Sequence, residues 1–165
     1  SAHLELAKLE SFFDVQIVTQ NIDNLHERAG SRNVLHLHGM IDVAKSSKTG
    51  KKLILNGKDI QIGDCCEAGY QLRPDIVWFG EDVPNMDVAA QIVSEADLFL
   101  IVGTSLNVYP AAGLVHVAPD RIPKFLVDPN LQRVNNIKNL SVISKNATEG
   151  VPLVADRIKS LLEVL

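Results

Sequence analysis

The chain has 165 residues, of which 46% are hydrophobic and 22% charged, a composition typical of one globular domain and not of a disordered segment. Its formal net charge of −4 gives no overall attraction to nucleic acid or to an anionic membrane, and no apolar run is long enough to span a bilayer. The two cysteines, Cys65 and Cys66, are adjacent, so the sequence predicts no disulfide framework and favours an intracellular, cytoplasmic location.

Strand-like and helix-like segments alternate along most of the chain. Residues 2–13 predict a helix, because Leu6, Leu9 and Phe13 recur at helical spacing. Short apolar strands are predicted at 15–19, 33–37, 97–103, 124–127 and 141–144, and further helices at 22–30, 86–97, 110–118 and 151–165. This alternation predicts an α/β fold in which helices cover both faces of a parallel sheet.

Residues 40–72 interrupt the alternation with a lysine-rich segment. Within it, "KKLILNGKDIQI" (residues 51–62) predicts a β-hairpin, because Asn56-Gly57 suits a type I′ turn between two strand-like runs. We therefore expect a main domain formed by residues 1–39 and 73–165, and a small insert subdomain formed by residues 40–72.

Small, amide, hydroxyl and acidic residues follow four of the predicted strands. They are Thr19-Gln20-Asn21-Ile22-Asp23, His38-Gly39, Gly103-Thr104-Ser105-Leu106-Asn107 and Asp128-Pro129-Asn130. Because ligands of parallel α/β sheets bind beyond the carboxyl ends of the strands, this pattern predicts a nucleotide or cofactor site. Two alternatives stay open: Asn21 or Asp23 can cap the next helix, and His36 and His38, which share a strand face, can be ordinary core residues.

Five segments resemble motifs of the sirtuins, the NAD-dependent protein-lysine deacylases. They are "TQNIDNLH", "HLHG", "QLRPDIVWFGE", "GTSLNVYPAAGL" and "VDPN", in the family's order, and the resemblance runs from about residue 2 to about residue 152. It implies a Rossmann-like fold, NAD as cofactor and an acylated-lysine protein or peptide as substrate, with no nucleic-acid or membrane partner. The products implied are the free lysine, nicotinamide and O-acyl-ADP-ribose.

The resemblance also implies the roles of individual residues. His38 is expected to be the catalytic base: after the acyl oxygen attacks ribose C1′ and expels nicotinamide, it helps to deprotonate a ribose hydroxyl, for which an imidazole suits neutral pH. The cofactor-binding residues implied are Gln20, Asn21, Asp23, Gly103, Thr104, Ser105, Asp128, Asn130 and Ala147. The first three belong to the nicotinamide and ribose pocket, the next three contact the adenosine side, and Asp128 stands where many family members carry Asn.

The peptide-binding segments follow from the same resemblance. The substrate is expected to add as a β-strand along backbone contributed by Val77, Phe79, Gly80, Glu81 and Val108, with Phe79 and Val108 lining the acyl-lysine tunnel. Ordinary core packing is the alternative for Trp78 and Phe79, and we expect it for at least one of them.

The insert departs from the family pattern. Many sirtuins hold a structural zinc there through four cysteines, and the aligned positions in this chain are Ser46, Thr49, Cys65 and Ala68. One thiol of four cannot form a tetrahedral thiolate site, so no zinc is expected. The insert is then expected to be held by its hairpin and by apolar contacts of Leu53, Leu55, Ile60 and Ile62.

The start of the chain is the second departure. The first strand of the Rossmann half and the Gly-Ala-Gly-x-Ser loop that cradles the NAD phosphates are not in this sequence. We expect a fragment of a longer protein, completed by an N-terminal segment, and little or no activity of the 165 residues alone. Natural truncation, a catalytically silent acyl-lysine peptide-binding module and a protein ADP-ribosyltransferase are the alternatives.

Overall fold

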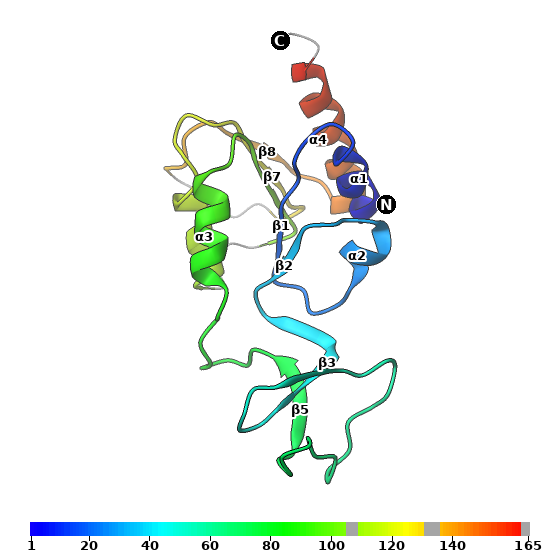
Figure 1. Ribbon diagram of the computed structural model, residues 1–165. Coiled ribbons are helices and arrows are strands. Elements are labelled where there is room, and N and C mark those ends of the chain that lie inside the picture. Colours follow the sequence, from blue (N-terminus) through cyan, green and yellow to red (C-terminus); the bar gives the residue numbers. More distant parts are fainter. Residues whose placement is uncertain (105–108, 131–135, 163–165) are drawn as a thin grey trace.

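A computed structural model describes residues 1–104, 109–130 and 136–162 of the chain. Figure 1 shows an upper part that carries the parallel strands and all the helices, and a lower part formed by a small antiparallel sheet. In chain order the elements are α1 (Ala2–Leu9), β1 (Ile17–Thr19), α2 (Leu25–Ala29), β2 (Val34–His36), β3 (Gly39–Ser46), β4 (Lys52–Ile54), β5 (Leu72–Ile76), α3 (Met86–Ser94), β6 (Phe99–Val102), the 3-10 helix η1 (Ala111–His116), β7 (Lys124–Val127), β8 (Leu140–Ile143) and α4 (Ala147–Leu162).

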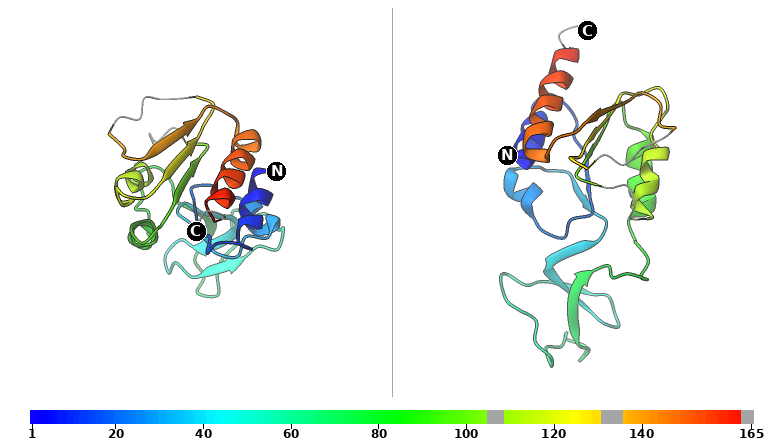
Figure 2. Two further views of the ribbon diagram at one scale, coloured as in Figure 1. Left: turned by 90° about the horizontal axis from the view of Figure 1, so that it is seen from above. Right: turned by 180° about the vertical axis from the view of Figure 1, so that it is seen from behind.

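The parallel strands form two sheets, β1-β2 and β6-β7-β8. All four residues of β7 are buried, as expected for the central strand of a sheet that is covered on both faces. On one face, Phe125 and Val127 pack against Val154 and Ile158 of α4. On the other face, Leu126 packs against residues of η1. Figure 2 shows α4 with α1 on one side of this sheet and α3 with η1 on the other.

Most predicted segments of the upper part form the expected elements. Helix α2 ends at Gly30, whose φ of 102° gives the left-handed turn that terminates many helices. The segment predicted as a helix at 110–118 is a 3-10 helix, and α1 ends four residues earlier than predicted, at Leu9. The last predicted helical residues, 163–165, lie outside the described part of the chain. Within the part that is described, no helix is both long and apolar enough to cross a membrane.

The lower sheet has the order β4-β3-β5 and is antiparallel throughout. The predicted turn at Asn56-Gly57 is present, because both residues have positive φ and the Lys58 N–H donates to the Leu55 carbonyl at 3.0 Å. The predicted hairpin is wrong, since residues 58–62 form no strand. β4 pairs instead with β3, whose eight residues offer a longer partner.

The forces that hold the insert also differ from the prediction. Leu53 and Ile62 are exposed, so they do not contribute the expected apolar contacts. Ser46, at an aligned zinc-thiolate position, is buried, and its hydroxyl accepts the N–H groups of Lys48 and Thr49. The Cys66 thiol donates to the same hydroxyl, a hydrogen bond that lowers the thiol pKa. Among the described residues, no group of three or more His, Cys, Asp or Glu is placed to hold a metal ion.

Candidate functional site

The loop that follows β1 is held by hydrogen bonds to three successive backbone carbonyls. The carbonyl of Gln20 lies 3.1 Å from Nδ1 of His38, and the carbonyl of Asn21 lies 3.0 Å from Nδ1 of His36. The carbonyl of Ile22 accepts the N–H of Ile41 at 2.8 Å. Three consecutive peptide groups are therefore fixed from β2 and β3, which orients the side chains of the loop.

The side chains of this loop have different environments. Asn21 is exposed, and its backbone N–H donates to the Thr19 hydroxyl at 3.1 Å. One carboxylate oxygen of Asp23 accepts the N–H of Leu25, the first residue of α2, at 3.0 Å. The capping alternative thus describes Asp23, whereas the exposed amide of Asn21 faces outward, where a ligand can reach it.

His38 has a defined tautomer. Because the Gln20 carbonyl can only accept a hydrogen bond, Nδ1 of His38 carries the proton of this bond. In the neutral ring, Nε2 therefore keeps its lone pair and can accept a proton. The carbonyl of His38 also accepts the N–H of Val77 at 3.0 Å, which ties the histidine to the segment that follows β5.

Gly39 makes this connection possible. Its φ is 78°, and a Cβ atom at this position would lie 1.8 Å from the carbonyl oxygen of Asp75. Only glycine combines this conformation with so close an approach of two backbones. The base and the predicted peptide-binding segment therefore depend on one glycine for their relative position.

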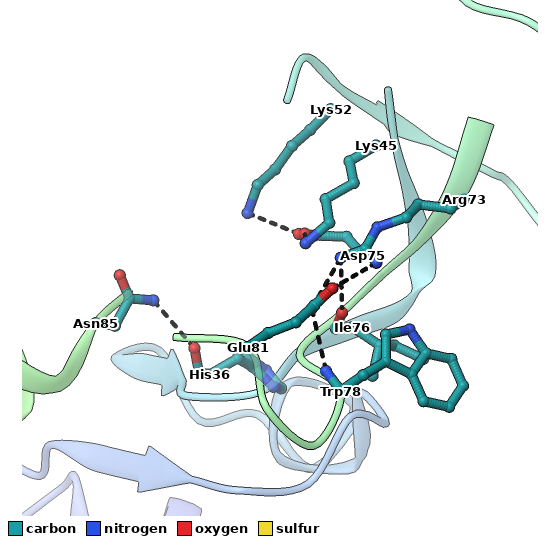
Figure 3. A network of polar contacts seen from close by, with 9 residues as sticks. All are labelled: His36, Lys45, Lys52, Arg73, Asp75, Ile76, Trp78, Glu81 and Asn85. Atoms are coloured by element: carbon teal, nitrogen blue, oxygen red, sulfur yellow. Dashed lines mark hydrogen bonds and ion pairs between the residues drawn. The ribbon is translucent and has the colours of Figure 1, made fainter. Parts of the chain in front are cut away.

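The segment from Val77 to Glu81 is organised by an ion pair. Figure 3 shows the guanidinium of Arg73 on the Glu81 carboxylate, with nitrogen–oxygen distances of 2.7 and 2.9 Å, and the N–H of Trp78 on the same carboxylate at 3.2 Å. The hydrogen bond from Arg73 and then that from Trp78 lower the pKa of Glu81 to about 2. The carboxylate of Glu81 thus folds its own loop, and Arg73 is a contributor that the sequence analysis missed.

Trp78 and Phe79 both project from this loop into solvent. Their exposed fractions are 55% and 101%, so the expectation that at least one of them is a core residue is wrong. The cause is local, because the ion pair between Arg73 and Glu81 turns the loop away from the apolar clusters of the upper part. Two large exposed side chains beside a free backbone are consistent with a peptide-binding segment.

The predicted adenosine side lies at the ends of β6 and β7. Gly103 is exposed with a φ of 61°, and its N–H donates to the Val127 carbonyl, with Thr104 next to it. Asp128 is buried, and its Oδ1 accepts the N–H of Asn130 at 2.7 Å, so this carboxylate shapes a turn. Ala147 begins α4. Ser105 and Val108 lie outside the described residues.

The site thus combines a base with a free nitrogen, a fixed loop with an exposed amide, and an exposed glycine at a strand end. The model of the Sir2 family matches residues 1–110. The chain belongs to the Sir2 family. An NAD-dependent protein deacylase of Bacteroides thetaiotaomicron (strain ATCC 29148) is 45% identical over 166 residues, covering 97% of this chain and 69% of the relative.

Solved structures agree with this assignment. A Sir2 homolog–NAD complex has a TM-score of 0.85 at 32% identity and covers 98% of this chain and 65% of its own. A Sir2 structure bound to acetylated peptide has a TM-score of 0.78 at 30% identity, over 94% and 69%. The predicted sirtuin family, Rossmann-like α/β fold, NAD cofactor and deacylase class are confirmed. The chain spans about two thirds of the length of these proteins.

Proposed function

We propose that the protein containing this chain removes acyl groups from lysine side chains with consumption of NAD, and that His38 is its base. The observation that carries the proposal is the bond from His38 Nδ1 to the Gln20 carbonyl, which leaves Nε2 as the basic nitrogen. The same loop presents the amide of Asn21, and the same histidine is bonded through its backbone to Val77. Base, cofactor loop and substrate segment are thereby mutually oriented.

The residues present fit NAD at its two predicted ends. Gln20, Asn21 and Asp23 would hold the nicotinamide and its ribose, since the Asn21 amide offers both a donor and an acceptor to a carboxamide. Gly103, with open space where a Cβ would be, would approach the adenosine side closely, near Thr104. NAD supplies an activated ribose carbon with nicotinamide as leaving group. Asp128, Asn130, Ala147 and Ser105 keep their predicted roles at the adenine end.

The substrate of this proposal is an extended peptide that carries an acyl-lysine. The exposed backbone at Val77, Phe79, Gly80 and Glu81 would pair with it on one side, and the segment of Val108 on the other. Backbone pairing of this kind gives affinity with little demand on the peptide sequence. The likeness to a Sir2 structure bound to acetylated peptide supports this class of substrate.

We further propose that an N-terminal segment of the same protein completes the parallel sheet. Among the described strands, β1 pairs only with β2, and β6 pairs only with β7, so each leaves one edge open. Val18 of β1 and Phe99 of β6 pack on the same apolar cluster, which supports a common neighbour between them. A parallel strand inserted there would satisfy both edges. The unbridged cysteines support a cytoplasmic location.

The test is NAD-dependent release of nicotinamide from an acetyl-lysine peptide by the full protein. His38→Ala is expected to lower the rate by roughly 10²–10⁴-fold, the usual worth of a general base. His116→Ala, at an exposed histidine of η1, is the matched control and should keep the rate. Release that survives His38→Ala would overturn the role of His38.

Two further measurements separate the alternatives. Peptide binding without nicotinamide release by the full protein would favour the silent binding module, and transfer of ADP-ribose to protein would favour the ADP-ribosyltransferase. The 165 residues alone are expected to be nearly inactive, because two strand edges of the sheet stay open. Efficient deacylation by this chain alone would contradict the proposed completing segment.

A further inference from the structure

His36 is a buried histidine whose two ring nitrogens are both engaged. Only 8% of its side chain is exposed. Nδ1 lies 3.0 Å from the carbonyl oxygen of Asn21, and Nε2 lies 2.8 Å from a carboxylate oxygen of Glu27. The alternative of an ordinary core histidine does not account for this arrangement, because the ring connects helix α2 directly to the cofactor loop.

The partners determine how many protons the ring carries. A carbonyl oxygen and a carboxylate oxygen both accept hydrogen bonds and cannot donate them. Both short contacts are therefore hydrogen bonds only if both ring nitrogens carry a proton, which makes His36 an imidazolium. Glu27 supplies the negative charge that stabilises this cation.

The surroundings of His36 fix the ring and balance its charge. Its own backbone carbonyl accepts the side-chain amide of Asn85, which precedes α3, at 3.0 Å (Figure 3). Glu27 and Asp23 are the anionic groups on α2 and on the loop, and both interact electrostatically with His26, as His36 does. His38 is the other titratable group of the same strand segment, and its ring bonds to the neighbouring carbonyl.

We propose that His36, held as an imidazolium by Glu27, is a positioning residue that fixes the Asn21 carbonyl and thereby aims the Asn21 amide at the nicotinamide end of NAD. The inference rests on the proposed function, in which Asn21 contacts the carboxamide. Loss of the bond frees one of the three fixed carbonyls of the loop, the one that belongs to the residue carrying this amide. The effect is therefore on cofactor affinity more than on the chemical step.

Two isosteric substitutions separate the two bonds of the ring. The amide of His36→Asn can occupy the position of Nδ1 and keep the bond to Asn21, while the amide of His36→Gln can occupy that of Nε2 and keep the bond to Glu27. We expect His36→Asn to keep the KM for NAD near its original value, and His36→Gln to raise it by about tenfold, with kcat little changed. Inhibition by added nicotinamide should weaken in parallel in His36→Gln. Equal KM values for the two variants would overturn the proposal.

Glu27→Gln tests the charge. Its amide can donate to Nε2, so a neutral His36 keeps Nδ1–H on the Asn21 carbonyl. In the unaltered protein, the KM for NAD should rise as increasing pH removes a proton from His36, since one ring nitrogen then faces an acceptor with its own lone pair. Glu27→Gln should flatten this rise. A pH profile that is the same in both proteins would contradict an imidazolium at this position.

Nuclear magnetic resonance of the full protein without ligand distinguishes this proposal from the proposed function. We expect both ring nitrogens of His36 to show protonated signals at neutral pH, and the Asn21 resonances to shift in His36→Gln but much less in His36→Asn. If these signals appear but NAD is not consumed, the proposed function fails while the positioning bond stands. If NAD is consumed and the ring is neutral, the positioning proposal fails alone.

Discussion

The β6-β7-β8 sheet and the β4-β3-β5 sheet have three strands each but bury different groups. The central strand of the first is buried on both faces, with Val127 fully enclosed beneath α4. In the second, the buried apolar side chains of the strands are Ala44 and Leu72, and Ile54 on β4 is exposed. Asp75 is buried there instead, bonded to Lys45 at 3.3 Å and Lys52 at 2.6 Å (Figure 3).

The difference shows how one short chain can be stabilised in two ways. The parallel sheet depends on apolar burial, which is insensitive to salt and largely insensitive to pH. The antiparallel sheet depends on backbone pairing and on a charged cluster, which respond to both. The candidate site lies at the junction, since His38 and Gly39 pass from β2 into β3. Damage to either sheet should therefore be distinguishable by how it reaches the site.

The largest effect is expected from Gly39→Ala at the junction. The added Cβ would overlap the Asp75 carbonyl oxygen, and the backbone has a φ of 78°, so β3 and β5 must separate. We expect a loss of about 4 kcal/mol or more in the free energy of unfolding, together with loss of deacylation. Gly57→Ala also has positive φ but meets no atom within 4 Å, so chemical denaturation should show a much smaller loss for this control. Similar losses for both would refute the overlap argument.

Two residues of α4 test the apolar half of the comparison. Ile158 is 4% exposed and packs on the parallel sheet, whereas Leu153, an isomer of the same size, is 53% exposed. Ile158→Ala should cost about 2–5 kcal/mol of unfolding free energy by leaving a cavity. Leu153→Ala should stay within about 0.5 kcal/mol. Denaturant titration at low and high salt should give the same difference, and a strong salt dependence would contradict an apolar origin.

Asp75→Asn tests the charged half. Burial by itself raises the pKa of the Asp75 carboxyl, but the hydrogen bonds and charges of Lys52 and Lys45 outweigh it, and the pKa lies below its ordinary value. Its contribution is therefore present above the unfolded pKa of about 3.9 and is lost as pH falls through the folded pKa. We expect Asp75→Asn to cost about 1–2 kcal/mol at neutral pH, less at high salt.

Hydrogen exchange of the Ala44 and Lys45 amides reports this loss directly, because both residues are paired within the small sheet. Exchange should accelerate in Asp75→Asn at neutral pH, and in the unaltered protein below about pH 4. Amides of β7 serve as the internal reference. Acceleration in both sheets alike would mean that the two are not stabilised separately.

The smallest effect is expected from His26, between α1 and α2. Burial, and then the nearby ring of His3, lower the pKa of His26 below its ordinary value of 6.5. Since the unfolded chain binds this proton more readily, the contribution of His26 is full above about pH 6.5 and declines as pH falls below it. Thermal unfolding at about pH 7.5 and about pH 5.5 should show a slight loss that His26→Phe reduces. An unchanged pH dependence would remove His26 as its cause.

Local sequence patterns predicted the elements whose stability is local. The apolar runs at β6, β7 and β8 and the amphipathic segments at α3 and α4 were correctly assigned, because periodicity reflects which face of an element is buried. The positive φ of Asn56 and Gly57 was also predictable from residue type. The pairing partner of β4 was not, because the competing strand, β3, begins thirteen residues earlier in the chain.

Site residues divide along the same line. The motif resemblance brought out His38, Asn21 and Asp23, and the structure gathers them in and beside one loop. It did not identify Arg73 or Glu27 as partners, since each acts through a bond to a residue eight or nine positions away whose direction depends on the fold. The exposure of Phe79 was missed for the same reason, because an aromatic side chain is apolar wherever the loop points.

The sequence by itself determined the family, the cofactor class, the alternation of strands and helices, and the residue types at the strand ends, because motif identity and hydrophobic period are properties of the chain in order. Only the tertiary structure decided which nitrogen of His38 is free, that His36 faces two acceptors, and that charges take the place of an apolar core in the small sheet. These features are set by distances between groups that lie on different elements, and packing alone brings those groups together.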